Sequence, residues 1–156
     1  MRRRCPHFRI DAAGVVYAFT WRLDHEQTPL APAERDVVAH AIQFWKHTRC
    51  RLFGFVVMDD HVHVVFELAA GVTVTALLHS WKSFSAWRLQ REFGRCGHIW
   101  QTCSYDHLVR DQRDLACQVA YVYGNPERRW PGIKDYRWVW TVGDPALLVA
   151  DPGTHW

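Results

Sequence analysis

The chain has 156 residues, 49% of them apolar and 14% aromatic, which suits one packed domain and excludes a disordered chain. No apolar run approaches the ~20 residues of a membrane helix, and the basic residues 2–4 precede no signal-peptide-like segment, so we expect a cytoplasmic protein without a membrane partner. The five cysteines are an odd number without a Cys-x-x-Cys pair, which predicts free, mostly buried thiols. The net charge of +3 is compatible with a polyanionic partner.

The first half of the chain shows a strand, a helix and two further strands. Residues 14–23 alternate as a half-buried strand, and Pro32 then opens a helical pattern. Residues 51–60 and 61–68 are apolar and strand-like, and they meet at an Asp-Asp pair that favours a tight turn. These two runs are therefore predicted to form a hairpin.

The second half continues with a helix, a strand and a helix. Apolar residues recur at helical spacing until Gly94 ends the first helix, and residues 98–111 fit a strand and a turn. Asp111 is expected to cap a last helix that ends near Gly124, where Asn-Pro follows. This order predicts an α+β sandwich with one antiparallel sheet and helices packed on one face. We expect residues 1–143 to form one domain and residues 144–156 a tail.

Two histidines in the hairpin are candidate metal ligands. Residues two apart in a strand point to the same face, so His61 and His63 project together. Two neutral imidazoles side by side can chelate a metal ion, and Glu67 on the same face is an alternative ligand. A strand histidine is more often a hydrogen-bonded core residue, so the pair alone does not decide between these roles.

The last helix carries a candidate nucleophile. Tyr121 and Asn125 are four residues apart and lie on one polar stripe, whereas Tyr123 is rotated by roughly 200°. An amide oxygen one turn from a phenol suits a third ligand for a hard cation beside two imidazoles. A metal placed there can polarise a phosphate that the tyrosine attacks. The polar stripe consists of Asp114, Gln118, Tyr121 and Asn125.

Four segments in this order resemble the single-tyrosine HUH transposases, and among these the REP-associated tyrosine transposases of bacteria. They are the His-Val-His at 61–63, IWQ at 99–101, YDHLVRD at 105–111 and VAYVYGNP at 119–126. The similarity covers roughly residues 10–142. It implies a ferredoxin-like sheet, a divalent metal such as Mg²⁺ or Mn²⁺, and cutting and rejoining of single-stranded DNA near short palindromes that fold as hairpins.

By position, the resemblance implies a role for four residues. It makes His61 and His63 metal ligands, Tyr121 the nucleophile, and Asn125 the ligand from the tyrosine helix. The chain departs from the family in two places: an Asp-Asp pair at 59–60 replaces the Pro-Asn or Pro-Glu that commonly precedes the first histidine, and Gly124 precedes Asn125.

Basic residues on the helix after the hairpin are candidate DNA contacts. Lys82, Arg88 and Arg91 are assigned to its polar side, where they either contact phosphates or form a solvated surface. Trp100 and Trp130 are candidates for stacking on unpaired bases. The sequence leaves three roles for His107: support of the site residues, contact with DNA, or burial with a hydrogen bond to the backbone.

Two classes of function fit this sequence. The first is a DNA strand transferase that forms a 5′-phosphotyrosine through Tyr121, and the second is a non-catalytic hairpin-binding protein derived from one. A nucleotide hydrolase of the His-x-His-x-His type is disfavoured because Val65 occupies the third position. A structural zinc site is disfavoured because Cys96 and Cys103 lack close spacing. Monomer and homodimer are equally compatible with the sequence.

Overall fold

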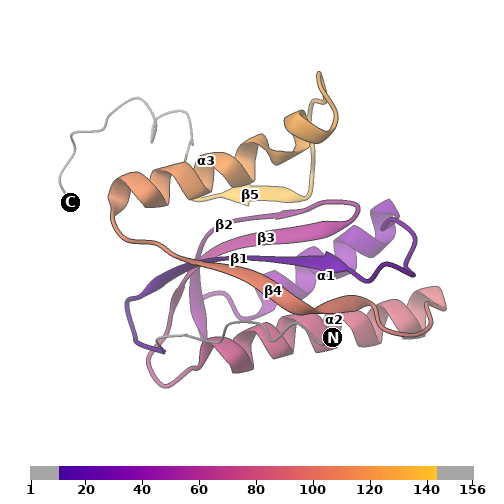
Figure 1. Ribbon diagram of the computed structural model, residues 1–156, viewed down its shortest axis with the longest axis horizontal. Helices are drawn as coiled ribbons and strands as arrows, with labels where there is room; N and C mark the ends of the chain where they lie inside the picture. Colours follow the sequence, from indigo (N-terminus) through magenta and orange to yellow (C-terminus); the bar gives the residue numbers. More distant parts are fainter. Residues whose placement is uncertain (1–10, 144–156) are drawn as a thin grey trace, which may run out of the picture.

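The computed structural model describes residues 11–143 (Figure 1). In chain order the elements are β1 (Val16–Leu23), α1 (Pro32–Phe44), β2 (Cys50–Val57), β3 (His61–Leu68), α2 (Val74–Phe93), β4 (Trp100–Leu108), α3 (Gln112–Arg129) and β5 (Val139–Thr141). The strands form one sheet in the order β4-β1-β3-β2-β5, and every pairing is antiparallel. The predicted α+β fold with a ferredoxin-like sheet is confirmed. The expected tail lies outside the described residues.

Helices cover both faces of the sheet. One core lies between the sheet and helices α1 and α2, and it includes Phe19, Trp21 and Phe66. A second core lies on the other face, where Val65 packs with Val119 and Val122 of α3. Figure 1 shows α3 on the opposite side of the sheet from α1 and α2. The expectation that helices pack on one face therefore holds for α1 and α2 and is wrong for α3.

The connections of the strands explain this arrangement. Helix α1 joins β1 to β2 and helix α2 joins β3 to β4, and each pair of strands is parallel with one strand between its members. Right-handed crossovers of this kind place both helices on the same face. Helix α3 follows the edge strand β4 and has no such constraint, so it covers the apolar second face.

The predicted β2–β3 hairpin is confirmed, and its turn fixes where the histidines begin. The amide of Met58 donates to the carbonyl of His61 at 2.8 Å. The carbonyls of Asp59 and Asp60 accept from the amides of Leu30 and Leu23 at 2.7 and 2.9 Å. The two turn carbonyls are thus bonded to the last residue of β1 and to the segment after it, which holds the hairpin end in place.

Helix ends follow the predicted signals with one exception. Gly94 is the C-cap of α2 with φ 68°, a left-handed conformation that glycine adopts at little cost, and the Asp111 side chain accepts from the Asp114 amide at the start of α3. Helix α3 nevertheless continues through Pro126 to Arg129, so the predicted end near Gly124 is wrong. Asn125 and Pro126 are both buried, and their packing offsets the hydrogen bond that proline cannot make.

The structure also tests the predictions for the cysteines and for membrane helices. Cys103 is disulfide-bonded, so the prediction of free thiols is wrong for it. Cys50, Cys96 and Cys117 are free, but only Cys50 is buried. No helix within residues 11–143 has the length and continuous apolarity needed to cross a bilayer.

Candidate active site

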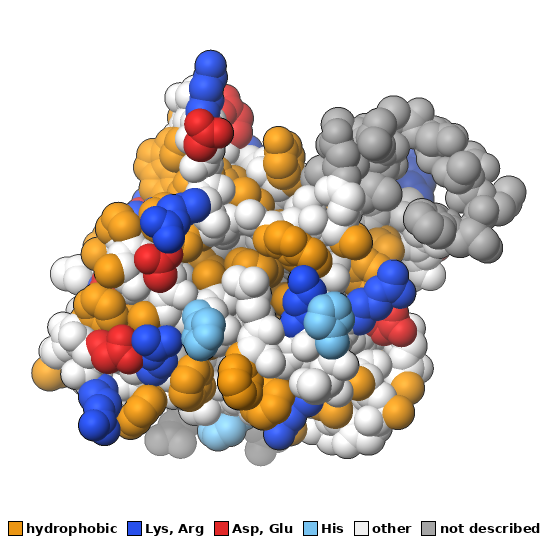
Figure 2. Space-filling view, turned by 180° about the vertical axis from the view of Figure 1, so that it is seen from behind, with side chains coloured by type: hydrophobic (Ala, Val, Ile, Leu, Met, Phe, Trp, Pro, Cys, Tyr) orange, Lys and Arg blue, Asp and Glu red, His pale blue; other side chains and the backbone are white. Residues whose placement is uncertain are grey.

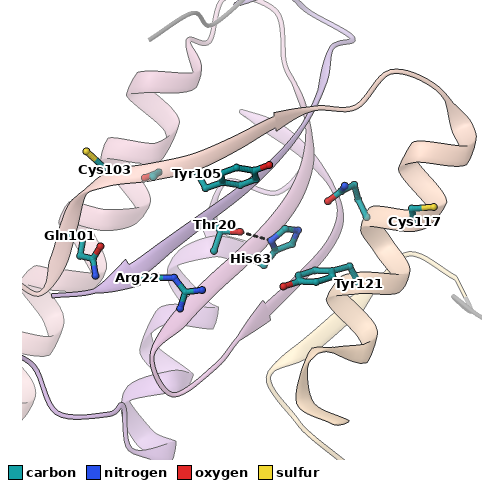
Figure 3. Close-up of a pocket in the computed structure, with 10 residues that line it drawn as sticks. Thr20, Arg22, His63, Gln101, Cys103, Tyr105, Cys117 and Tyr121 are labelled. Atoms are coloured by element: carbon teal, nitrogen blue, oxygen red, sulfur yellow. Dashed lines mark hydrogen bonds between the residues drawn. The ribbon is translucent and has the colours of Figure 1, made fainter. Parts of the chain in front are cut away.

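An open pocket of about 790 Å³ lies on the α3 side of the sheet (Figure 3). Strands β1, β3 and β4 form its floor, and helix α3 forms one wall. In Figure 3 the side chains of His63 and Tyr121 lie next to each other, with Thr20 on the other side of the imidazole. The residues lining the pocket are Thr20, Arg22, His63, Gln101, Cys103, Ser104, Tyr105, Cys117, Gln118 and Tyr121.

His63 is buried with one ring nitrogen bonded and the other without a partner. Its Nδ1 lies 2.6 Å from Thr20 Oγ1, because the register of β1 and β3 pairs these two residues. Its Nε2 is buried and forms no hydrogen bond with the described residues. Burial, and next the positive charge of His61, lower the pKa of His63 to about 4, and an interaction with the Gln118 side chain opposes them. The ring is therefore neutral at neutral pH. When Nδ1 donates to Thr20, the Nε2 lone pair is available to a metal ion.

His61 is oriented by its neighbour in the turn. Its Nδ1 lies 2.7 Å from Asp60 Oδ1. Burial raises the pKa of Asp60, but the bond to His61 and the charges of Arg129 and Arg22 outweigh burial and leave the pKa below its usual value. Asp60 is thus an anion that fixes the imidazole, an arrangement frequent beside metal-binding histidines. The second aspartate of the Asp-Asp turn supplies this carboxylate.

The other turn aspartate is tied to the tyrosine helix. Asp59 Oδ2 forms an ion pair with Arg129 Nη2 at 3.1 Å, and Arg129 is the last residue of α3. Asp59 Oδ1 is buried without a hydrogen-bond partner among the described residues. The hairpin turn therefore contacts both the first histidine and the end of α3.

Helix α3 places Tyr121 against His63. The two ring centroids are 5.1 Å apart, and Tyr121 is 47% exposed at the pocket. Tyr123 is also exposed but does not line this pocket. The predicted difference in direction between the two tyrosines is confirmed, and of the two only Tyr121 contacts His63.

Arg128 packs on Tyr121, and Gly124 makes room for it. The guanidinium carbon lies 4.2 Å from the centroid of the Tyr121 ring, and Nη2 donates to the Tyr121 carbonyl. A Cβ at position 124 would lie 3.1 Å from Arg128 Nη1. Gly124 therefore leaves room for the Arg128 guanidinium beside the phenol.

The buried, unpaired Nε2 of His63 fits a metal ligand, and Asn125 is the candidate for a further one. Asn125 is 6% exposed, lies one turn after Tyr121, and its Nδ2 has no hydrogen-bond partner among the described residues. Within residues 11–143 no three His, Cys, Asp or Glu side chains are grouped to hold a metal. A third protein ligand beside two imidazoles would therefore be a neutral donor, for which the Asn125 amide oxygen is the candidate from the sequence. Glu67 is unsuitable because it lies four strand residues, or about 13 Å, from His63 and pairs with Arg51 at 3.9 Å.

His107 connects the edge strand to the tyrosine helix. Its Nε2 lies 2.8 Å from Asp114 Oδ2, and Asp114 also accepts from the amide of Arg110 at 3.0 Å. Asp114 interacts in turn with Gln118, which contacts His63. Of the roles left open by the sequence, the supporting one agrees with this position. The predicted polar stripe of α3 is the surface that carries these contacts.

Comparison with known proteins identifies the family. The family model described as "Transposase IS200 like" matches residues 14–123 of this chain. The chain belongs to the IS200-like transposase family. A REP-associated tyrosine transposase of Escherichia coli (strain K12) is 27% identical over 136 residues, which are 84% of this chain and 73% of the relative. The predicted resemblance to these proteins is confirmed.

A solved structure shows the same fold as this chain. It is described as the REP-associated tyrosine transposase bound to a REP hairpin. It superposes with a TM-score of 0.71 at 23% identity and covers 87% of this chain and 82% of that chain. At this identity the match supports the ferredoxin-like architecture and not the roles of individual residues.

The three basic residues assigned to one side of α2 are not all on the same side of the helix. Lys82 faces β4 and donates from Nζ to the carbonyl of Gln101 at 2.7 Å. Arg88 faces α1 and forms a two-oxygen ion pair with Glu92 at 2.6 and 3.0 Å. Arg91 packs on the Trp87 ring at 5.4 Å. The expectation of a shared side is wrong for Lys82, because nine residues at about 100° each put it half a turn from Arg91, whereas Arg88 and Arg91 are neighbours three residues apart.

Sequence reasoning missed Thr20 and Arg128, which the fold brings to His63 and Tyr121. Thr20 is 43 residues from His63, and only the strand register reveals their contact. Arg128 follows Tyr121 by seven residues, a helical spacing that points to one face, and this signal was available in the sequence. Trp100, considered for base stacking, is buried and donates from Nε1 to Ser85 Oγ at 3.0 Å.

Proposed function

We propose that this protein cuts and rejoins single-stranded DNA at or near hairpins, through a 5′-phosphotyrosine on Tyr121. The observation that carries the proposal is the position of Tyr121, an exposed phenol 5.1 Å from the ring of the buried His63 at an open pocket. Membership of a transposase family supports DNA processing. The hairpin partner is inferred from the related structure, which is described as bound to a REP hairpin.

The reaction is an exchange of phosphate esters. The Tyr121 hydroxyl oxygen forms a bond to the scissile phosphorus and loses its proton, the bond from phosphorus to the 3′ oxygen breaks, and that oxygen takes a proton to become a 3′-OH. Rejoining is the reverse step, in which a 3′-OH attacks the phosphotyrosine and frees the phenol. One phosphodiester replaces another at each stage, so the exchange needs no external energy source.

His61, His63 and Asn125 would hold the divalent metal, for which we propose Mg²⁺ or Mn²⁺. A bound divalent ion would supply charge stabilisation on the phosphate oxygens. Asp60 and Thr20 orient the two imidazoles through their Nδ1 atoms. Arg128 adds a fixed positive charge beside the phenol, which favours approach of the anionic phosphate.

Transfer of label to the protein tests the nucleophile. Wild-type protein incubated with labelled single-stranded DNA from beside its own gene should form a covalent adduct that survives denaturing electrophoresis. Tyr121→Phe should lose the adduct and keep hairpin binding, because the ring remains and only the attacking oxygen is removed. Tyr123→Phe is the matched control and should form the adduct normally. Mapping of the adduct to Tyr123 would contradict the assignment.

Metal removal tests the second part of the proposal. Chelator-treated protein should lose cleavage and regain it with Mn²⁺ or Mg²⁺, and His63→Ala should lose it with metal present. Circular dichroism checks that the variant is folded. Cleavage that survives both treatments removes the metal from the mechanism. Hairpin binding by wild-type protein that never forms an adduct would support the non-catalytic alternative.

A further inference from the structure

Three exposed aromatic side chains form a continuous surface on helices α1 and α2. Phe44 is 60% exposed, Phe84 40% and Trp87 51%. The centroid of Phe84 lies 6.5 Å from that of Phe44 and 6.1 Å from that of Trp87, with interplanar angles of 30° and 29°. We call these three residues the aromatic surface. It takes no part in either core of the sheet.

A small cavity opens beside this surface. It has a volume of about 250 Å³ and is lined by Ala41, Phe44, Trp45, Ser80, Ser83 and Phe84. Three large rings at a groove between two helices expose apolar area that folding ordinarily buries, and patches of this kind mark binding surfaces. The serine hydroxyls of the lining already bond to carbonyls of their own helix, since Ser80 and Ser83 donate to Ala76 and His79. The cavity therefore offers mainly ring surface.

Arginines flank the aromatic surface at both ends. At one end Arg91 lies 5.4 Å from the Trp87 ring centroid. At the other end Arg49 lies 3.7 Å from the ring of Trp45, which packs edge-on against Phe44. On the face seen in Figure 2, hydrophobic side chains lie among Lys, Arg and His, with some Asp and Glu between them. The aromatic surface is thus bordered by positive charge.

This charge argues against a second copy of the chain as the partner. In a twofold symmetric dimer the same patch meets itself, so Arg49 and Arg91 would face arginines of the other copy. Like charges brought together at an interface are unfavourable. Exposed rings bordered by guanidinium groups instead match a polyanion with exposed bases, because bases stack on aromatic rings while arginines contact phosphates.

We propose that the aromatic surface binds unpaired nucleotides of single-stranded DNA. This inference rests on the proposed function, which supplies such DNA next to hairpins. Helices α1 and α2 cover the face of the sheet opposite to α3, so Phe84 and Trp87 lie on the far side of the sheet from Tyr121 (Figure 1). The nucleotides bound here are therefore a different segment from the one that is cut.

Binding of a 20-nucleotide oligo(dT) to the full chain tests the inference. Fluorescence anisotropy of the labelled oligonucleotide should give a Kd that rises by roughly fivefold to a hundredfold in Trp87→Ala and in Phe84→Ala, the effect of losing one stacked base. Tyr123→Ala removes an equally exposed aromatic side chain from α3 and should change the Kd by less than about twofold. At saturating hairpin DNA, Trp87→Ala should still form the Tyr121 adduct.

Oligo(dT) binding and sedimentation velocity can each contradict the inference. A wild-type protein that does not bind oligo(dT), or ring variants that bind it as tightly as wild type, would overturn the inference. Sedimentation velocity that shows a dimer becoming a monomer in Trp87→Ala, with DNA affinity unchanged, would assign the surface to a second copy instead. Loss of oligo(dT) binding in the ring variants, together with no adduct in wild type, would support this surface and contradict the proposed nucleophile.

Discussion

Thr20 shows how one residue can set the chemistry of the site. Its Oγ1 lies 2.6 Å from Nδ1 of His63, and Nε2 is left without a hydrogen-bond partner among the described residues. A metal-binding histidine needs its second nitrogen held in this way, so that the ring has a fixed tautomer and orientation. Thr20 and Asp60 play the same part for the two histidines, because each lies at hydrogen-bond distance from one Nδ1, Thr20 with a hydroxyl and Asp60 with a carboxylate.

We predict that Thr20→Val weakens Mn²⁺ binding by about 10- to 100-fold, the usual effect of removing a group that orients a metal-binding histidine. The valine also leaves Nδ1 of His63 buried and unpaired, which should lower stability by about 1–3 kcal/mol. Isothermal titration calorimetry with Mn²⁺ measures the first effect, and urea unfolding the second. Thr20→Ser keeps the hydroxyl and should bind metal almost as wild type. Unchanged Mn²⁺ affinity in Thr20→Val would remove Thr20 from the metal site.

At the scale of the elements, a buried ion pair joins the start of α1 to a residue just after the end of α2. Glu34 lies in the first turn of α1, and Arg95 follows α2. Arg95 Nη2 lies 2.7 Å from Glu34 Oε2, and both side chains are less than 10% exposed. Arg95 also donates to the carbonyls of Thr28 and Pro29 at 2.8 and 3.1 Å. This pair fixes the start of α1 against the end of α2.

We predict that Glu34→Ala lowers the free energy of unfolding by about 3 kcal/mol at pH 7, because it leaves a buried guanidinium without its anion. The hydrogen bond to Arg95 outweighs burial and holds the pKa of Glu34 below its usual value of 4.5. The stability from this group is therefore fully present above about pH 4.5 and is lost as the pH falls through the lowered pKa.

Urea unfolding of wild type and of Glu34→Gln at several pH values measures this dependence. The stability difference between the two should be constant near neutral pH and shrink below about pH 4.5. Their other carboxyl groups are the same and cancel in the comparison. A difference that stays constant down to pH 3 would show that the charge of Glu34 contributes nothing to stability.

At the scale of the whole molecule, the sheet separates two surfaces with different chemistry. His63, Tyr121 and Arg128 lie on the α3 side, whereas the aromatic surface lies on the outside of α1 and α2. Lys82 is bonded to the carbonyl of Gln101 in β4 and holds α2 to the sheet edge. Arg91 is on the outside of α2 beside Trp87. Lys82 and Arg91 of helix α2 therefore make different contacts, Lys82 with strand β4 and Arg91 with the aromatic surface.

We predict that Arg91→Ala reduces the salt dependence of single-strand binding, with the slope of log K against log [salt] smaller by about 0.7, the value for one phosphate contact. Lys82→Ala should leave that slope unchanged and instead lower the melting temperature, because a charged hydrogen bond to Gln101 is lost. Anisotropy titrations at four salt concentrations and thermal unfolding measure the two effects. Equal changes of slope in both variants would mean that Lys82 also contacts phosphate.

Local periodicity in the sequence determined which way each residue points from its own element. The period of two in β3 put His61 and His63 on one face, and the helical period in α3 separated Tyr121 from Tyr123. Turn and cap residues marked the hairpin at 59–60 and the end of α2 at Gly94. These features depend on neighbours a few positions away, so the sequence alone was sufficient for them.

Tertiary structure decided what depends on the pairing of distant segments. The contact of Thr20 with His63 follows from the register of β1 and β3, and the face that α3 covers follows from its exit at the edge strand β4. The continuation of α3 through Pro126 depends on packing that offsets the missing hydrogen bond, against the local signal of Asn-Pro. Each outcome is set by contacts between residues far apart in the chain. The free energy of these contacts outweighs the local preference, and a short stretch of sequence does not contain both partners.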